Sequence, residues 1–440
     1  MATVRPFCPY RYNPALFPEL AALVAPPYDV IGPEEQKLLH QRHPLNVVRL
    51  ILSAADDPYE SAAKLWQQWR QEHYIVQEPE PCIVFSVERF SLGKEVRERT
   101  GVYAAVGLEA FGSGKIRPHE RTFSAPKEDR LRLLRACRAN LSPIFGVYPD
   151  HAGLLERLRA WCERRKPEMR VLDTLGTEHR LWFIREARWH AAIRKELAEE
   201  EIIIADGHHR YETALAYCEE VVRQGQDSPD AGHRFVLMYL TSMEDPGLAV
   251  LPTHRVLQTV ANPASLHQRI EQHFEVRQYP LERAEEFFQA LDQGAGRHCL
   301  GLGWGGSRNL ELAFLRDEEV LRRYAGDLAP AVRELDVTLL DRVVLQGFAG
   351  IVPDEEARAG RLWYTHSDRE AVAALSQGAA AVFFMRPPRM ADILAVCRAG
   401  QVMPQKSTYF YPKLLSGLLF QAVDEPLPPE SARTPAQMAR

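Results

Sequence analysis

The sequence lacks the features that mark several classes of protein. Its seven cysteines stand singly with no C-x-x-C pair, and an odd number of lone thiols suits a reducing compartment. No stretch approaches the roughly 18 consecutive apolar residues that a membrane-spanning helix requires. The opening residues MATVRPFCPYRYNP contain no apolar run of the kind found in secretory signals. We therefore expect a soluble cytoplasmic protein with no membrane partner.

An excess of charge of either sign is also missing. The chain has 54 Lys and Arg against 59 Asp and Glu, a formal net charge of −5, so no general field draws it to nucleic acid. Hydrophobic residues make up 46% and charged residues 26%, proportions that exclude wholesale disorder. At about 150 residues per domain, 440 residues predict three domains or one core with large additions.

Both helix and strand patterns occur along the chain, and we expect an α+β protein. In the C-terminal part the periodicity predicts one long helix near 332–348. From changes in pattern we expect an N-terminal α/β unit over 1–100, a core over 101–245, a C-terminal α/β region over 246–423 and a mobile tail over 424–440.

Some motifs indicate structure more than binding. GLGWGG at 301–306 formally matches the G-x-G-x-x-G nucleotide fingerprint, but that fingerprint needs a helix opening after it. Here the alternation of apolar residues continues on both sides of a Gly-Gly-Ser-Arg-Asn turn, which predicts a β-hairpin. LPTHRV at 251–256 and PPYDV at 26–30 are more typical of structural corners than of ligand contacts.

The segment EIIIADGHHRYETAL predicts a buried strand, a tight turn at Asp206-Gly207 and a helix that begins near His208. The first turn of a helix attracts anions, so the positive charge of His208, His209 and Arg210 there is unfavourable unless an anion binds. We therefore predict that Gly207, His208 and Arg210 bind phosphate or a nucleotide. A structural alternative is that Asp206 caps the helix, Gly207 relieves the turn and the histidines are solvated.

A second charged segment, KIRPHERTFSAPKEDR, places His119 and Glu120 directly after a predicted strand. A carboxylate beside cations can act as a general base, which makes Glu120 a candidate catalytic residue and His119 a candidate phosphate contact. The alternative is a solvated charged loop leading into a helix, because runs of charge usually face solvent.

Near the C-terminus, MPQKSTYFYPKL interleaves lysines and hydroxyls with aromatic residues between two prolines. Lys406, Ser407 and Lys413 could hold a phosphate or a carboxylate. Such polar groups are unusual in a rigid turn without a purpose, so we expect the segment to fold back toward Asp206 and His209 and complete a pocket. In the alternative, the aromatic residues pack in the core and the lysines are solvated.

Seven short blocks occur along the chain in the order RPF, PPYDV, PHERT, SPIFGVY, ADGHHRYETAL, LPTHRV and MPQKSTYFYPKL. These blocks and their order resemble the prokaryotic family called domain of unknown function 1015. The resemblance spans nearly the whole chain. The family name itself implies no activity.

The D-G-x-H-R core, formed by Asp206, Gly207, His209 and Arg210, resembles the box of ParB-like nucleotide-binding proteins. It is most similar to their small-molecule branch, the free-serine kinases, in which a His-Glu pair precedes the box. The resemblance implies a ParB-like central core flanked by N-terminal and C-terminal α/β regions. It implies that Glu120 is the general base, and that Asp206 and His209 act at the phosphates, with Asp206 also near Mg²⁺.

These signals together predict a nucleotide-dependent phosphotransferase, a small-molecule kinase that acts on a hydroxyl-bearing metabolite such as serine. The expected cofactors are Mg²⁺ and ATP or ADP, and the expected partners are the nucleotide and the substrate. A ParB-like nucleotide-switched binding protein is one alternative, although it would normally need a helix-turn-helix and a basic face. A metal-dependent hydrolase is another, although no H-E-x-x-H spacing occurs. The sequence does not determine the oligomeric state.

Overall fold

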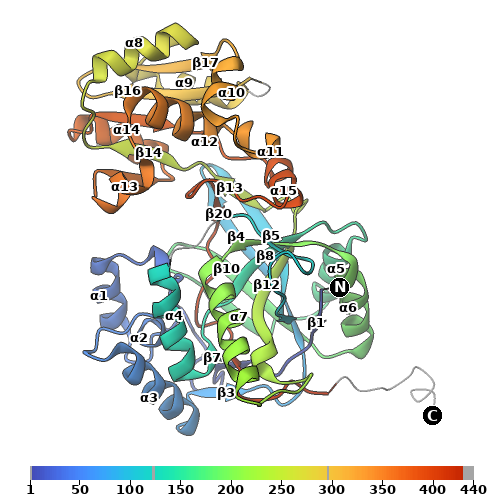
Figure 1. Ribbon diagram of the computed structural model, residues 1–440. Coiled ribbons are helices and arrows are strands. Elements are labelled where there is room, and N and C mark those ends of the chain that lie inside the picture. Colours follow the sequence, from blue (N-terminus) through green and yellow to red (C-terminus); the bar gives the residue numbers. More distant parts are fainter. Residues whose placement is uncertain (1, 121–123, 295–296, 430–440) are drawn as a thin grey trace. The chain divides into compact units, whose positions relative to one another are not determined.

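The computed structural model describes residues 2–120, 124–294 and 297–429, and the chain forms two compact units (Figure 1). Unit 1 comprises 1–118, 122–248 and 412–440, and unit 2 comprises 119–121 and 249–411. Both units combine helices with sheets, which confirms the predicted mixed α and β class. Among the described residues, no helix is both long enough and apolar enough to cross a membrane.

Unit 1 is built on a nine-stranded mixed sheet. The strands lie side by side in the order β6 (Ile116–Pro118), β11 (Ile202–Asp206), β8 (Ile144–Tyr148), β12 (Phe235–Ser242), β5 (Glu95–Gly107), β4 (Ile83–Leu92), β10 (Glu178–Ile184) and β9 (Met169–Leu172), with β1 (Val4–Arg5) beside β5. Strand β11 is parallel to β6 and antiparallel to β8, β8 is parallel to β12, and the other neighbours are antiparallel.

Apolar periodicity explains several helices of unit 1, because apolar residues of α4 (Ser124–Cys137), α5 (Leu154–Cys162), α6 (Ala187–Glu199) and α7 (His208–Arg223) enter one continuous core with the sheet. Leu158 and Ile193, on two of these helices, share that core with Phe85 of β4. The helices are α1 (Pro33–Arg42), α2 (Val48–Ile51), α3 (Pro58–Gln71), α4 (Ser124–Cys137), α5 (Leu154–Cys162), α6 (Ala187–Glu199) and α7 (His208–Arg223). Two small sheets pair β2 (Tyr10–Tyr12) with β3 (Ile75–Gln77) and β7 (Ala139–Asn140) with β21 (Gln421–Ala422).

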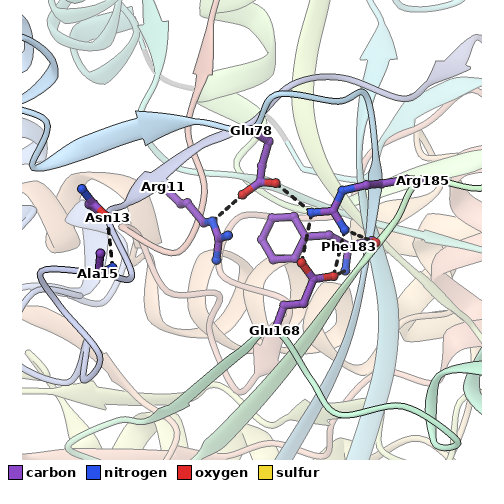
Figure 2. A network of polar contacts seen from close by, with 7 residues as sticks. All are labelled: Arg11, Asn13, Ala15, Glu78, Glu168, Phe183 and Arg185. Carbon is purple, nitrogen blue, oxygen red and sulfur yellow. Dashed lines mark hydrogen bonds and ion pairs between the residues drawn. The ribbon is translucent and has the colours of Figure 1, made fainter.

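A network of ion pairs ties the N-terminal segment of unit 1 to the large sheet (Figure 2). The buried carboxylate of Glu78 accepts hydrogen bonds from Arg11 at 2.6 Å and from Arg185 at 2.8 Å. Arg185 also bonds Glu168 at 3.0 Å, and the Arg11 guanidinium lies over the ring of Phe183 at 4.6 Å. Because Glu78 accepts hydrogen bonds from both Arg11 and Arg185, it holds β2 against β10, the strand that ends just before Arg185.

Unit 2 contains an antiparallel six-stranded sheet and its own apolar core. Its strand order is β15 (Phe274–Pro280), β17 (Asn309–Leu315), β16 (Cys299–Trp304), β19 (Ala381–Phe384), β14 (His254–Leu257) and β18 (Leu362–Thr365), and β13 (Ala249–Leu251) pairs with β20 (Tyr409–Tyr411). The helices are α8 (Pro263–His273), α9 (Ala284–Gln293), α10 (Glu319–Ala325), α11 (Pro330–Arg333), α12 (Asp336–Thr338), the π-helix η4 (Leu339–Ala349), α13 (Pro353–Arg358), α14 (Asp368–Ser376) and α15 (Met390–Arg398).

Several local expectations can be compared with these elements. The predicted hairpin around 301–306 is confirmed, with Gly301 opposite Leu312 and Gly303 opposite Leu310. The long helix predicted near 332–348 is confirmed over most of its length, since α12 and η4 follow each other directly over 336–349, but its first residues belong to the separate helix α11. Pro330 opens α11, and Leu335 stands in extended backbone before α12, which interrupts the helix.

The domain boundaries predicted from the sequence can be compared with the strands and units of the structure. Position 100 lies inside β5, so the sheet of unit 1 continues through it, while unit 2 resumes at Ala249, three positions beyond 246. At the end of the chain, Glu425 accepts hydrogen bonds from Tyr10 at 2.8 Å and from Arg70 at 2.5 Å. The rest of the predicted mobile tail, from 430 onward, lies outside the described residues.

Candidate functional site

The turn between β11 and α7 forms the first part of the candidate site, in unit 1. Ile202, Ile203 and Ile204 are fully buried in β11, and the strand ends at Asp206. Gly207 follows with a φ of +89°, in the left-handed region that favours glycine, and α7 begins at the next residue. Strand, turn and helix therefore occur where the sequence predicted them.

Two cations hold the carboxylate of Asp206. Lys413 Nζ donates to Oδ1 at 2.5 Å, and Arg210 Nη2 donates to Oδ2 at 2.7 Å. All three side chains are largely buried, with exposed fractions of 12–14%. Burial by itself raises the pKa of Asp206, but the charges of Lys413 and Arg210 outweigh it and leave that pKa well below its ordinary value. Asp206 is therefore a permanent anion that positions two cations.

The Arg210 guanidinium also reaches back over the turn. It donates to the backbone carbonyl of Pro143, at the start of β8. A Cβ atom added at Gly207 would lie 3.0 Å from three atoms of that guanidinium, so the glycine leaves the space in which Arg210 lies. His208 at the first position of α7 is buried, and its charge further lowers the pKa of Asp206.

The helix that carries these residues is anchored along its length. The hydroxyl of Tyr211 donates to the carbonyl of Glu109 and accepts from its N–H, both at 2.9 Å. Lys127 of α4 forms an ion pair with Glu212. The cap at Gly207 makes no side-chain hydrogen bond to the first turn of α7. The helix is thus held by hydrogen bonds and an ion pair along its length rather than by a side-chain cap at its start.

A second group of predicted residues lies in unit 2. The His119 backbone carbonyl accepts from Met403 N at 2.8 Å, and Glu120 forms a parallel bridge with Met403. His119 Nε2 lies 2.7 Å from Thr408 Oγ1, and Lys406 N donates to Glu120 Oε1 at 3.2 Å. The predicted His-Glu pair and the K-S-T turn therefore contact each other.

Within the K-S-T turn the two predicted binding residues differ. Lys406 has a φ of +56°, rare for a residue with a side chain, and is exposed. Ser407 is buried, and its hydroxyl donates to the carbonyl of Pro404. Lys406 thus stands on a turn with an uncommon backbone conformation, and the Ser407 hydroxyl closes that turn.

The structure brings the predicted residues together in two sets. Unit 1 holds the turn residues 206–210 with Lys413, and unit 2 holds His119, Glu120, Lys406 and Ser407. The expectation that the C-terminal segment returns to Asp206 holds for Lys413 as a direct contact, and for Lys406 and Ser407 it stays a prediction. Sequence analysis missed the Pro143 carbonyl, although the SPIFGVY block that contains it was noted. In the described parts of both units, no three His, Cys, Asp or Glu side chains are grouped so that they could hold a metal ion.

Residues 4–338 match the model of a protein family described as a protein of unknown function, DUF1015. The chain belongs to this family. The match confirms the resemblance drawn from the seven sequence blocks. A comparison with curated proteins gave no match.

Solved structures with partial similarity to this DUF1015 member include a mutant free serine kinase in complex with ADP, at 14% identity over 67% of this chain and 84% of that chain, with a TM-score of 0.34. SbnI with a C-terminal truncation from Staphylococcus aureus has 13% identity over 71% and 85%, with a TM-score of 0.34. A conserved hypothetical protein from Pyrococcus furiosus has 17% identity over 68% and 89%, with a TM-score of 0.33. The ParB-like character of the core stays a prediction.

Proposed function

We propose that the protein is a nucleotide-dependent phosphotransferase that acts on a small hydroxyl-bearing metabolite. The observation that carries the proposal is the group of charges around Asp206. Two side-chain cations, Lys413 and Arg210, surround one carboxylate at the start of α7, where the helix dipole is also positive. The group keeps an excess of positive charge, which suits the phosphates of a nucleotide.

In the proposed reaction, the carboxylate of Glu120 accepts the proton of the substrate hydroxyl. The hydroxyl oxygen attacks the terminal phosphorus of the nucleotide, and the bond from that phosphorus to the bridging oxygen breaks. The leaving group is ADP when the nucleotide is ATP, and AMP when the nucleotide is ADP. Arg210, Lys413 and His209 offset the negative charge on the phosphate oxygens, the main task of a protein in phosphoryl transfer.

Mg²⁺ belongs to this proposal as the ion that accompanies nucleotide phosphates and neutralises their charge. Both oxygens of Asp206 already accept hydrogen bonds from cations, so direct ligation of Mg²⁺ would require Lys413 or Arg210 to move. The arrangement as it stands does not fit Asp206 as a magnesium ligand. The proposal accordingly gives Asp206 the role of positioning the two cations.

Nucleotide binding to the full chain tests the proposal directly. By isothermal titration calorimetry, we expect ATP or ADP with Mg²⁺ to bind, and Lys413→Met to weaken binding about tenfold or more, since it removes a hydrogen bond from a charged group. Lys195→Met, at an exposed position of α6, is the control and should bind normally. Phosphorus NMR with a panel of hydroxyl-bearing metabolites then identifies the phosphate acceptor. Absence of nucleotide binding, or normal binding by Lys413→Met, would overturn the proposal.

A further inference from the structure

Arg255 of unit 2 is a buried cation with an unsatisfied polar atom. It lies in β14, opposite Tyr364 of β18, and its exposed fraction is 2%. Its Nη1 donates to the carbonyl of Thr253 at 2.6 Å, while its Nη2 finds no hydrogen-bond partner in the described part of the chain. A buried guanidinium donor without an acceptor is costly, so its retention calls for an explanation.

Asp341 is the nearest opposite charge and is unsatisfied as well. Its Oδ1 is buried, lies 4.0 Å from Arg255 Nε and accepts no hydrogen bond from any described residue. Burial raises the pKa of Asp341 to about 6, because Arg255 offsets only part of its cost. The residue stands on the π-helix η4. π-Helical turns are rare in proteins, and those that occur are often found at functional sites. The two groups thus face each other without forming a hydrogen bond.

The charges around this pair are mixed. The pKa of Tyr364 is raised to about 12, first by burial; Arg255 lowers it, and Asp341, Asp354 and Glu120 raise it further. Its ring centroid lies 5.6 Å from the Arg255 guanidinium. A ligand with only a negative charge would be attracted by Arg255 but repelled by the acidic side chains. A ligand with only a positive charge would be repelled by Arg255. A ligand that carries both charges on neighbouring atoms matches both groups.

We infer that Arg255 and Asp341 form a binding site for the zwitterionic head group of a small amino acid. The carboxylate of the ligand accepts from Arg255 Nη2, and its ammonium donates to Asp341 Oδ1. Tyr364 and Asp341 are both partly exposed, whereas Arg255 is almost fully buried. The inference rests on the proposed function only in naming this ligand as the phosphate acceptor.

L-Serine and two related compounds that each lack one of its charged groups separate the possible ligand classes. L-Serine carries both charges, glycerate lacks the ammonium group and ethanolamine lacks the carboxylate. With the full chain and no nucleotide, we expect calorimetry to show that L-serine binds about tenfold or more tightly than either single-charge compound, because each lacks one charged contact. Equal binding of L-serine and glycerate would indicate a simple anion site and overturn the inference.

Two variants connect the binding to the residues. Arg255→Gln and the isosteric Asp341→Asn should each weaken L-serine binding about tenfold or more, since each removes one charged contact. Arg389→Gln, at an exposed position before α15, is the control and should not change it. If Arg255→Gln does not fold, Asp341→Asn decides the question, and unchanged L-serine affinity in it would overturn the site.

Nucleotide binding, measured in the same samples, separates this inference from the proposed function. If ADP or ATP binds but none of the three compounds does, the amino acid site is wrong while the nucleotide proposal stands. If L-serine binds with the expected variant effects and no nucleotide binds, the site stands and the phosphotransferase proposal fails.

Discussion

Lys413 donates a 2.5 Å hydrogen bond to Asp206, although 207 positions separate the two residues in the chain. The contact joins the returning C-terminal segment to the β11–α7 turn within unit 1. With Arg210 on the other oxygen, the carboxylate has a cation on each side. Asp206 is thus the centre around which the positive charges of the turn are arranged.

Asp206→Asn should lower the free energy of unfolding in a pH-dependent way. The pKa of Asp206 is lowered in the folded state, so its ionised form contributes stability above its unfolded pKa of about 3.9. That contribution is lost as the pH falls through the lower folded pKa. We expect a cost of about 3 kcal/mol near neutral pH, because two largely buried cations lose their counter-ion, and a smaller cost in acid. Urea denaturation at a series of pH values measures both.

Asp56→Asn, at an exposed position, is the matched control and should change stability by less than about 0.5 kcal/mol. An Asp206→Asn cost that stays constant down to the most acid pH would contradict the assignment of Asp206 as a strongly stabilised anion.

Gly207→Ala should impair both stability and nucleotide binding. Its φ of +89° is unfavourable for alanine by roughly 1–2 kcal/mol, and the new Cβ would press on Arg210. Gly225→Ala is the control, because Gly225 has a similar φ of +79° but no atom within 4 Å of an added Cβ. Both variants should lose stability in thermal unfolding, and only Gly207→Ala should weaken ADP binding. Equal ADP binding by the two would show that the crowding of Arg210 does not matter.

The sequence was most informative where one local pattern determines the structure. Ile202–Ala205 followed by Asp206-Gly207 predicted the strand, turn and helix, because four apolar residues and a glycine act within one short segment. The hairpin at 301–306 followed for the same reason. The π-helix near Asp341 was not predicted, since its hydrogen-bond pattern leaves almost no trace in apolar spacing.

Long-range pairings were harder to predict. The approach of Lys413 to Asp206 was expected from residue chemistry alone, because no local pattern shows where the chain returns to unit 1. Arg255 lies in a motif that we interpreted as a structural corner. The binding role that we propose for Arg255 depends on Asp341, 86 positions later, and no local sequence pattern links the two residues.

A buried network in the large sheet of unit 1 predicts a second pH dependence. His179 is fully buried, with Nε2 3.3 Å from Asp173 and Nδ1 3.6 Å from Glu88. Arg99 also donates to Glu88, at 2.7 Å from Nε. Burial by itself lowers the pKa of His179, but the two carboxylates outweigh it, and the pKa is raised above its ordinary value.

His179→Gln should therefore destabilise the protein most at low pH within the range where the carboxylates stay ionised. A raised folded pKa means that the imidazolium stabilises the fold below its unfolded pKa of about 6.5, and that this contribution disappears as pH rises through the folded value. We expect a loss of about 3 kcal/mol near pH 6 that shrinks toward pH 9 in urea denaturation. His151→Gln, at an exposed loop position, should show no such trend. A loss that grows with pH would mean that His179 is neutral in the folded protein.

Glu120→Gln provides the sharpest test of the proposed chemistry, because it separates catalysis from binding. Glutamine keeps the shape of the side chain and an oxygen that can accept from Lys406 N, so the turn in unit 2 should stay intact. It cannot take the substrate proton, and a general base contributes a factor of about 10² to 10⁴ in rate. We expect phosphoryl transfer to fall by about that factor while ADP binding remains unchanged, since Asp206, Arg210 and Lys413 are untouched.

Glu318→Gln, at an exposed position before α10, is the control for this prediction and should leave phosphoryl transfer unchanged. Normal turnover by Glu120→Gln would remove Glu120 from the mechanism, whereas lost nucleotide affinity would indicate a role in binding instead.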